Sequence, residues 1–153
     1  DRSRDRQAEA LQHLAQEHSG RRLAAEGHPN TLLVAATTQE ETGERGAHTA
    51  AEVARPQIGI AIEGGVSGDV PGARPEETQA RLGAGPGVFL YDFVEQPNRR
   101  LIGLIKDTAR TEKIPLQFDL VSGYGDDSSE IQRSNGGVPT VINSTVLMRY
   151  HQM

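Results

Sequence analysis

Short apolar runs, separated by polar and turn-forming residues, divide this chain into predicted strands. Two continuous runs, residues 31–36 and 58–62, have the length and composition of strands that are covered on both faces. Residues 88–91 form a third strand. Residues 116–120 alternate like a half-buried strand, and residues 138–143 give a last one that is entered through a proline.

Helical spacing of apolar residues fills the gaps between these strands. It predicts helices at residues 7–15, 47–53, 101–109 and 130–134. Gly20 is placed to end the first helix before a loop at 21–30, and Asn98 can cap the third. Strands that alternate with helices indicate an α/β fold, with a mixed, mostly parallel sheet and helices on both faces.

The length of the chain limits the number of domains, and its composition limits which residues can form the core. The chain has 153 residues, enough for one domain or part of a larger one. It contains three Phe, three Tyr and no Trp, so its core must consist mainly of Val, Ile, Leu and Ala. Gly and Pro dominate residues 64–87. Such a long loop in a compact domain is usually functional or disordered.

Charge and residue usage exclude several classes of function. With 16 Lys and Arg against 21 Asp and Glu, the formal net charge is −5, which disfavours nucleic-acid partners. The absence of Cys excludes disulfides, Cys-based zinc sites and a thiol nucleophile. No apolar run approaches the ~20 residues of a membrane span, and no apolar signal core is visible. We therefore expect a soluble, cytoplasmic protein with no membrane partner.

Two adjacent carboxylates, Glu40 and Glu41, directly follow the first apolar run. At the end of a buried strand such a pair is costly unless a cation receives it. In a metal site one of the two can bind the ion while its neighbour takes a proton from water. The alternative is a capping box, because Thr37 with Glu40 and Thr38 with Glu41 have its spacing. From spacing alone the two interpretations are equally good.

Three further residues extend the candidate site. Glu63 ends the 58–62 strand, and it would face the edge that carries Glu40 and Glu41 if the two strands are parallel neighbours. For an isolated Glu the simpler explanation is a solvated loop acid. Asp127, in a Gly-loosened polar loop, could bind a cation or an amine, or it could cap the next helix. Of five His, His151 is the best placed for a site at the strand ends.

At this point several segments resemble one family, the M42 metallo-aminopeptidases of the glutamyl and tetrahedral group. Residues 34–47 closely resemble the family signature, residues 62–72 its second ligand segment, and residues 82–87 its Gly-rich run before a strand. Residues 124–132, 137–140 and 149–150 continue the match in the right order. The resemblance covers roughly residues 28–151, so residues 1–153 are expected to form a single, partial metallopeptidase catalytic domain of zinc-exopeptidase-like fold.

The resemblance implies a two-metal site with Zn or Co as the divalent ions. Glu40 matches the general base, Glu41 a metal ligand and Glu63 an acidic ligand, while Asp127 matches the acidic residue near the substrate amine. His151 takes the place of the final His ligand with a shift of one residue. The family's first His ligand matches a position upstream of this chain.

The expected function is metal-dependent removal of N-terminal residues from peptides, by a large homo-oligomer. Two alternatives remain open. A glycosidase could use Glu40 and Glu63 as its acid and its nucleophile or base without metal. The chain could also be a non-catalytic assembly piece with an incomplete site.

Overall fold

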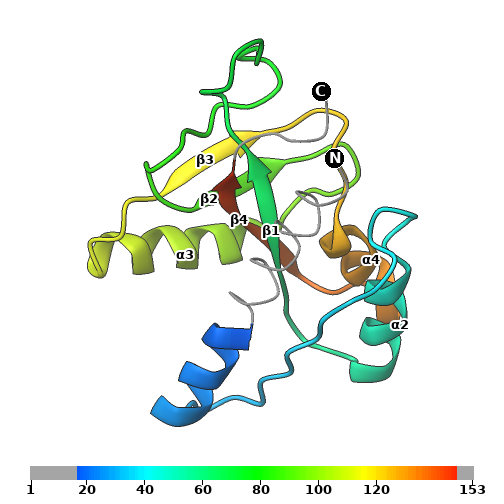
Figure 1. Ribbon diagram of the computed structural model, residues 1–153. Helices are drawn as coiled ribbons and strands as arrows, with labels where there is room; N and C mark the ends of the chain where they lie inside the picture. Colours follow the sequence, from blue (N-terminus) through cyan, green and yellow to red (C-terminus); the bar gives the residue numbers. More distant parts are fainter. Residues whose placement is uncertain (1–16, 148–153) are drawn as a thin grey trace.

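A four-stranded sheet forms the centre of the computed structural model, which describes residues 17–147 and the side chains of residues 17–142 (Figure 1). The strands are β1 (Gly59–Val66), β2 (Gly87–Tyr91), β3 (Gln117–Leu120) and β4 (Thr140–Leu147), in the order β1-β4-β2-β3. β1 is parallel to β4 and β2 to β3, whereas β2 and β4 are antiparallel. The predicted mixed, mostly parallel sheet is confirmed.

Helices lie on both sides of this sheet. Figure 1 shows α3 (Arg99–Thr111) on one side, with α2 (Arg45–Ala54) and α4 (Asp127–Arg133) on the other; a 3₁₀ turn at Ser134–Gly136 follows α4. Asn98 caps α3 as expected, because its side chain accepts hydrogen bonds from the backbone N–H groups of Arg100 and Leu101. Gly59 allows α4 to approach β1, since a Cβ there would lie 2.6 Å from the Ile131 side chain.

The small hydrophobic centre lies between the sheet and the loop that precedes α4. Phe89, Val121 and Ile142 form it, and Tyr124 packs against Phe89 edge-to-face with ring centroids 5.6 Å apart. Much of the remaining buried volume belongs to polar side chains. Among the described residues these include several carboxylates, namely Glu63, Asp92, Glu95, Asp119 and Asp126.

The N-terminal helix differs from the sequence prediction. The helix predicted at 7–15 lies outside the described residues, but residues 17–26 are helical, so Gly20 does not end a helix and residues 21–26 are not a loop. Ion pairs one turn apart, Glu17 with Arg21 and Arg22 with Glu26, stabilise this helix. The helix ends instead at Gly27, whose φ of 80° lets its N–H bond the Leu23 carbonyl.

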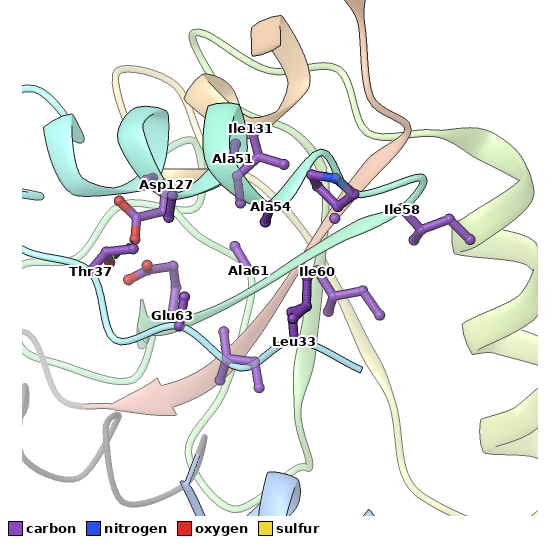
Figure 2. A pocket seen from close by; sticks show the side chains of 16 residues that line it. Leu33, Thr37, Ala51, Ala54, Ile58, Ile60, Ala61, Glu63, Asp127 and Ile131 are labelled. Carbon is purple, nitrogen blue, oxygen red and sulfur yellow. Dashed lines mark hydrogen bonds between the residues drawn. The ribbon is translucent and has the colours of Figure 1, made fainter. Parts of the chain in front are cut away.

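The strand predicted for residues 31–36 is wrong. These residues are extended but form no ladder, and Leu33 and Val34 are 61% and 55% exposed. The segment runs beside β1 without strand pairing (Figure 2), and Leu33 and Ile60 line the space between them. An apolar run favours burial, but a strand also needs a neighbouring strand with which its backbone can form hydrogen bonds.

Other boundaries shift by a few residues. β1 continues to Val66, so Glu63 lies within the strand and not at its end. The long loop is confirmed for residues 67–86, and side chains hold it in place. Asp119 accepts hydrogen bonds from the Thr78 hydroxyl and the Gln79 N–H, both at 2.7 Å, and Asp69 pairs with Arg81 at 2.9 Å. In the described part of the chain no helix is long and apolar enough to span a bilayer.

Candidate functional site

Glu40 is carried by a tight loop between the extended segment and α2. The chain turns back on itself there, and the Gly46 N–H donates to the Thr38 carbonyl at 2.9 Å. A Cβ at Gly46 would lie 2.4 Å from the Thr38 backbone nitrogen, so only glycine fits. α2 begins at Arg45, and its N-cap residue is Glu44 in a left-handed conformation. The capping-box alternative for residues 37–41 is therefore wrong.

The Glu40 carboxyl titrates far from its ordinary range. Partial burial and, to a smaller extent, the negative charges of Glu41, Asp127, Glu44 and Asp126 together raise its pKa from 4.5 to about 7. A carboxyl with this pKa exchanges its proton near neutral pH, which is what a general base requires.

Glu63 and Asp127 line one cavity together. Its volume is about 150 Å³, its remaining walls are mostly aliphatic, and Thr37 lies between the two acids (Figure 2). Glu63 is only 7% exposed. The Thr37 hydroxyl donates a hydrogen bond to Asp127 Oδ2, while Asp127 Oδ1 is buried without a hydrogen-bond partner. One oxygen of Asp127 is thus held and the other is available to a ligand.

Tyr124, which sequence analysis did not identify, is a partly buried phenol that feels the charge of nearby carboxylates. Its hydroxyl donates to the Gly64 carbonyl at 3.0 Å. Burial raises the pKa of Tyr124, and the charges of Glu63, Asp126, Glu40 and Glu41 raise it further. The charges of Glu40, Glu41 and Glu63 thus all act on one partly buried phenol, although the strand expected to precede Glu40 does not form.

The helix cap offered as one alternative for Asp127 is wrong. Asp126 caps α4 instead, because its side chain accepts the Ser128 N–H. Because Asp126 takes this role, the Asp127 carboxyl faces Thr37 instead. Sequence analysis also missed Glu44, which accepts a hydrogen bond from the Ser129 hydroxyl at 2.5 Å and so joins the Glu40 loop to α4.

The group of carboxylates around Tyr124 has the chemistry of a cation site. Oxygen ligands of Glu41 and Glu63 suit a divalent ion. A cation would also relieve the repulsion that raises the pKa of Glu40, and it could draw on the buried Asp127 Oδ1. No histidine from the described part of the chain lines the cavity, and His151 lies outside the described residues.

Comparison with known proteins gives an independent result. A model of the M42 glutamyl aminopeptidase family matches residues 16–153. The FrvX protein of Escherichia coli (strain K12) is 36% identical over 111 residues, covering 72% of this chain and 31% of FrvX. The curated relatives are matched over 31–35% of their length, so this chain spans about a third of them.

Solved structures agree with the family match. The TET aminopeptidase from the marine sediment archaeon Thaumarchaeota archaeon SCGC AB-539-E09 has a TM-score of 0.81 and 36% identity, covering 87% of this chain and 38% of that one. The Pyrococcus horikoshii TET1 peptidase, which can assemble into a tetrahedron or a large octahedral shell, has a TM-score of 0.64 and 27% identity, covering 75% and 32%. The family match over almost the whole chain shows that it belongs to the M42 glutamyl aminopeptidase family.

Proposed function

We propose that the protein containing this chain is a metal-dependent aminopeptidase that removes N-terminal residues from peptides. The observation that carries the proposal is Glu40, whose pKa is raised to about 7 among neighbouring carboxylates in a chain of this family. Residues 1–153 would form a single, partial catalytic domain, because the match covers only 31% of FrvX and 35% of the Lactococcus lactis glutamyl aminopeptidase.

Glu41, Glu63 and His151 are the residues that would hold two divalent ions, with Zn or Co as the expected metals. When bound, two such ions supply positive charge that polarises a scissile carbonyl and makes a nearby water easier to deprotonate. Their charge would also offset the repulsion that Glu41 exerts on Glu40.

Glu40 is the proposed general base, and later the general acid. It accepts a proton from the attacking water and passes it to the amine that leaves. A base with a pKa near the working pH is efficient in both directions, because it neither holds the proton too tightly nor gives it up too readily. The loop fixed by Gly46 against Thr38 holds Glu40 in place for this exchange.

Asp127 is the proposed anchor for the substrate ammonium group. Its Oδ2 atom accepts from Thr37, which orients the carboxyl, and its buried Oδ1 has no partner of its own. An N-terminal ammonium would supply the missing donor. Binding at this position distinguishes an exopeptidase from an endopeptidase, since a peptide with a blocked N-terminus loses the interaction.

Two variants test the division of roles. Glu40→Gln is expected to abolish release of the N-terminal residue from a peptide while the bound metal, measured by elemental analysis, is unchanged. Glu41→Gln is expected to lower metal occupancy. Equal loss of metal in both variants would contradict the assignment. Glu76→Gln, an exposed acid in the long loop, is the matched control.

Chelation separates this proposal from the two alternatives. An aminopeptidase of this kind loses activity in chelator and regains it with Zn²⁺ or Co²⁺. Hydrolysis of a glycoside that persists after metal removal would favour the glycosidase with Glu40 and Glu63. A folded protein without either activity and without a metal-dependent change in stability would favour the non-catalytic role.

We further propose a homo-oligomer, on the strength of the assembly named for the Pyrococcus horikoshii TET1 peptidase. A monomeric mass of the purified protein in light scattering would exclude it. The cytoplasmic location and the absence of nucleic-acid partners stay predictions from the sequence.

A further inference from the structure

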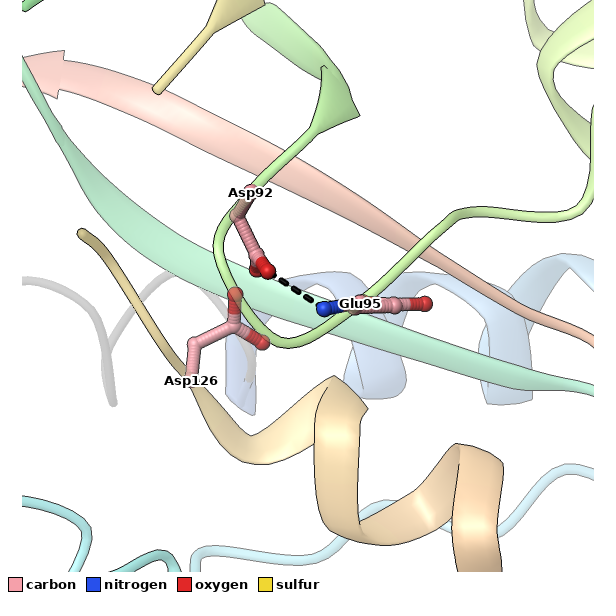
Figure 3. Close-up of side chains that lie close together, drawn as sticks. All are labelled: Asp92, Glu95 and Asp126. Carbon is pink, nitrogen blue, oxygen red and sulfur yellow. Dashed lines mark hydrogen bonds between the residues drawn. The ribbon is translucent and has the colours of Figure 1, made fainter. Parts of the chain in front are cut away.

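We propose a second cation site, formed by Asp92, Glu95 and Asp126, which shares no ligand with the proposed site of Glu41 and Glu63 and is suited to a hard divalent ion such as Ca²⁺. Each of the three residues offers one carboxylate oxygen, and these oxygens all lie within 4.8 Å of one another. The residues come from two segments that are distant in sequence, the loop after β2 and the start of α4 (Figure 3).

Backbone N–H groups orient two of the three side chains, Asp92 and Asp126. Asp92 Oδ1 accepts hydrogen bonds from the N–H groups of Val94 and Glu95, at 2.6 and 2.5 Å, in a tight turn that follows β2. Asp126 Oδ1 accepts from the Ser128 N–H at 2.7 Å as the cap of α4. Both carboxyls are therefore oriented by their own loops, before any ligand is considered.

The Glu95 carboxylate is oriented from two further directions. It accepts hydrogen bonds from the Ser128 hydroxyl of α4 and from the Thr140 hydroxyl at the start of β4. Each carboxylate oxygen has two lone pairs, so these bonds leave acceptor capacity on Glu95.

Two oxygens of the cluster accept no hydrogen bond from an N–H or hydroxyl group of the described residues. They are Asp92 Oδ2 and Asp126 Oδ2, and both residues have an exposed fraction of 0%. Figure 3 shows the two carboxyl groups turned toward one another. Buried carboxylate oxygens without donors are costly, and two that face each other add repulsion. They point to a bound positive charge between them.

The described side chains do not supply this charge. Among residues 17–142, the ion pairs of Arg and His involve other acids, and none includes a member of the cluster. Glu95 is 2% exposed, so solvent ions do not screen the group well. Burial and the mutual repulsion of the carboxyls raise the pKa of both Glu95 and Asp126 to about 7.

Ligand chemistry identifies the kind of ion. The candidate ligands are oxygens only, which favours Ca²⁺, Mg²⁺ or Mn²⁺ over Zn²⁺, for which histidine and cysteine are common ligands. Oxygens at about 2.4 Å from Ca²⁺ are up to about 4.8 Å apart, which agrees with the spread of the cluster. Mg²⁺ requires shorter distances and near-ideal octahedral geometry, so it fits less well.

Such an ion would tie the β2–α3 loop to the first turn of α4. That turn carries Asp127, the residue that contacts Thr37 in the candidate site. The second ion would thus position a residue of the peptidase site without itself taking part in the reaction.

Calcium titration tests the proposal. The 153-residue chain is prepared with Glu41→Gln and Glu63→Gln, which removes two proposed ligands of the first site, and is stripped with chelator. At pH 8, which is above the pKa of about 7 of Glu95 and Asp126, calorimetry with CaCl₂ is expected to show one ion per chain. A hundredfold excess over Kd is expected to raise the Tm by several degrees.

Two isosteric variants locate the site. Asp126→Asn and Asp92→Asn, made separately in this background, are each expected to weaken Ca²⁺ binding at least tenfold. Asn keeps the capping bond of Asp126, so this variant retains α4 and remains informative if Asp92→Asn fails to fold. Asp107→Asn, an exposed acid of α3 paired with Arg110, is the matched control and is expected to bind like the background chain.

Three results would each overturn the proposal. One is the absence of Ca²⁺ binding at pH 8 in the background chain. Another is unchanged binding in Asp126→Asn. The third is a chain whose stability rises on acidification from pH 8 to 6 with no effect of Ca²⁺, because a shared proton would then be the positive charge between Asp92 and Asp126.

Discussion

Replacing Glu40 by Gln is expected to stabilise the metal-free chain at pH 8 and to leave its stability at pH 4.5 almost unchanged. The pKa of Glu40 is raised from 4.5 to about 7 in the folded chain, mainly by burial and then by Glu41 and Asp127. The folded chain thus binds a proton more tightly than the unfolded chain. Its stability falls as the pH rises from about 4.5 to about 7, and the full penalty is present above 7.

The size of the effect follows from this shift. A rise of about 2.5 pKa units corresponds to at most about 3.4 kcal/mol. Glu40 is only half-buried, so solvent screening reduces this figure, and we expect Glu40→Gln to raise the free energy of unfolding by about 1–2 kcal/mol at pH 8. Well below pH 4.5 the carboxyl is protonated in both states and contributes nothing, and at pH 4.5 itself the remaining effect is only about 0.4 kcal/mol.

Urea denaturation in the presence of chelator, followed by far-ultraviolet circular dichroism, measures this difference. Curves for the wild-type chain and Glu40→Gln at pH 4.5, 6 and 8 give the dependence on pH. The exposed Glu76→Gln serves as the control and is expected to change stability by less than about 0.5 kcal/mol. An effect of Glu40→Gln that is absent at pH 8, or equal at pH 4.5 and 8, would refute the electrostatic argument.

Three further substitutions test the fold around the site, each by urea denaturation. Gly46→Ala is expected to cost about 2 kcal/mol, because its Cβ would lie within 2.5 Å of the Thr38 backbone, and a neutral result would mean that the loop relaxes. Tyr124→Phe is expected to cost about 1–2 kcal/mol through loss of the bond to the Gly64 carbonyl, and an unchanged midpoint would exclude that bond. Asn98→Ala is expected to cost about 1 kcal/mol, whereas Asn98→Asp, which keeps a capping oxygen, is expected to cost much less.

Elements whose signals are local could be predicted from the sequence. α3 was located by its helical spacing and its cap, because Asn98 supplies the hydrogen bonds that the first turn needs. β2 was located because its apolar residues Val88 and Phe89 are buried in the sheet. β3 was also located, but its predicted buried face is wrong, because Asp119 is buried while Phe118 and Leu120 are exposed. The acids at 40, 41, 63 and 127 were chosen because adjacent or strand-end carboxylates are costly without a partner.

Features that depend on tertiary contacts could not be predicted. Asp92 and Glu95 read as ordinary loop acids in the sequence, and only the fold brings Asp126 next to them. Tyr124 gave no signal either, because its role depends on packing against Phe89 and reaching Gly64 across 60 residues. Asp126 caps α4 and Asp127 does not, but the two acids are adjacent, so the sequence alone does not show which of them is the cap.

Glu40 and Glu63 are held by elements other than those expected. The sequence argument placed both at the ends of adjacent parallel strands, but the residues before Glu40 form no strand and Glu63 lies inside β1. Contacts made by Thr37 and Glu44 replace strand pairing, since both side chains bond to α4, through Asp127 and Ser129. Because α4 also packs on β1, where Gly59 admits Ile131, the helix serves as the common reference for both acids. A substitution that shifts α4 is therefore expected to disturb the site more than one that alters the exposed extended segment.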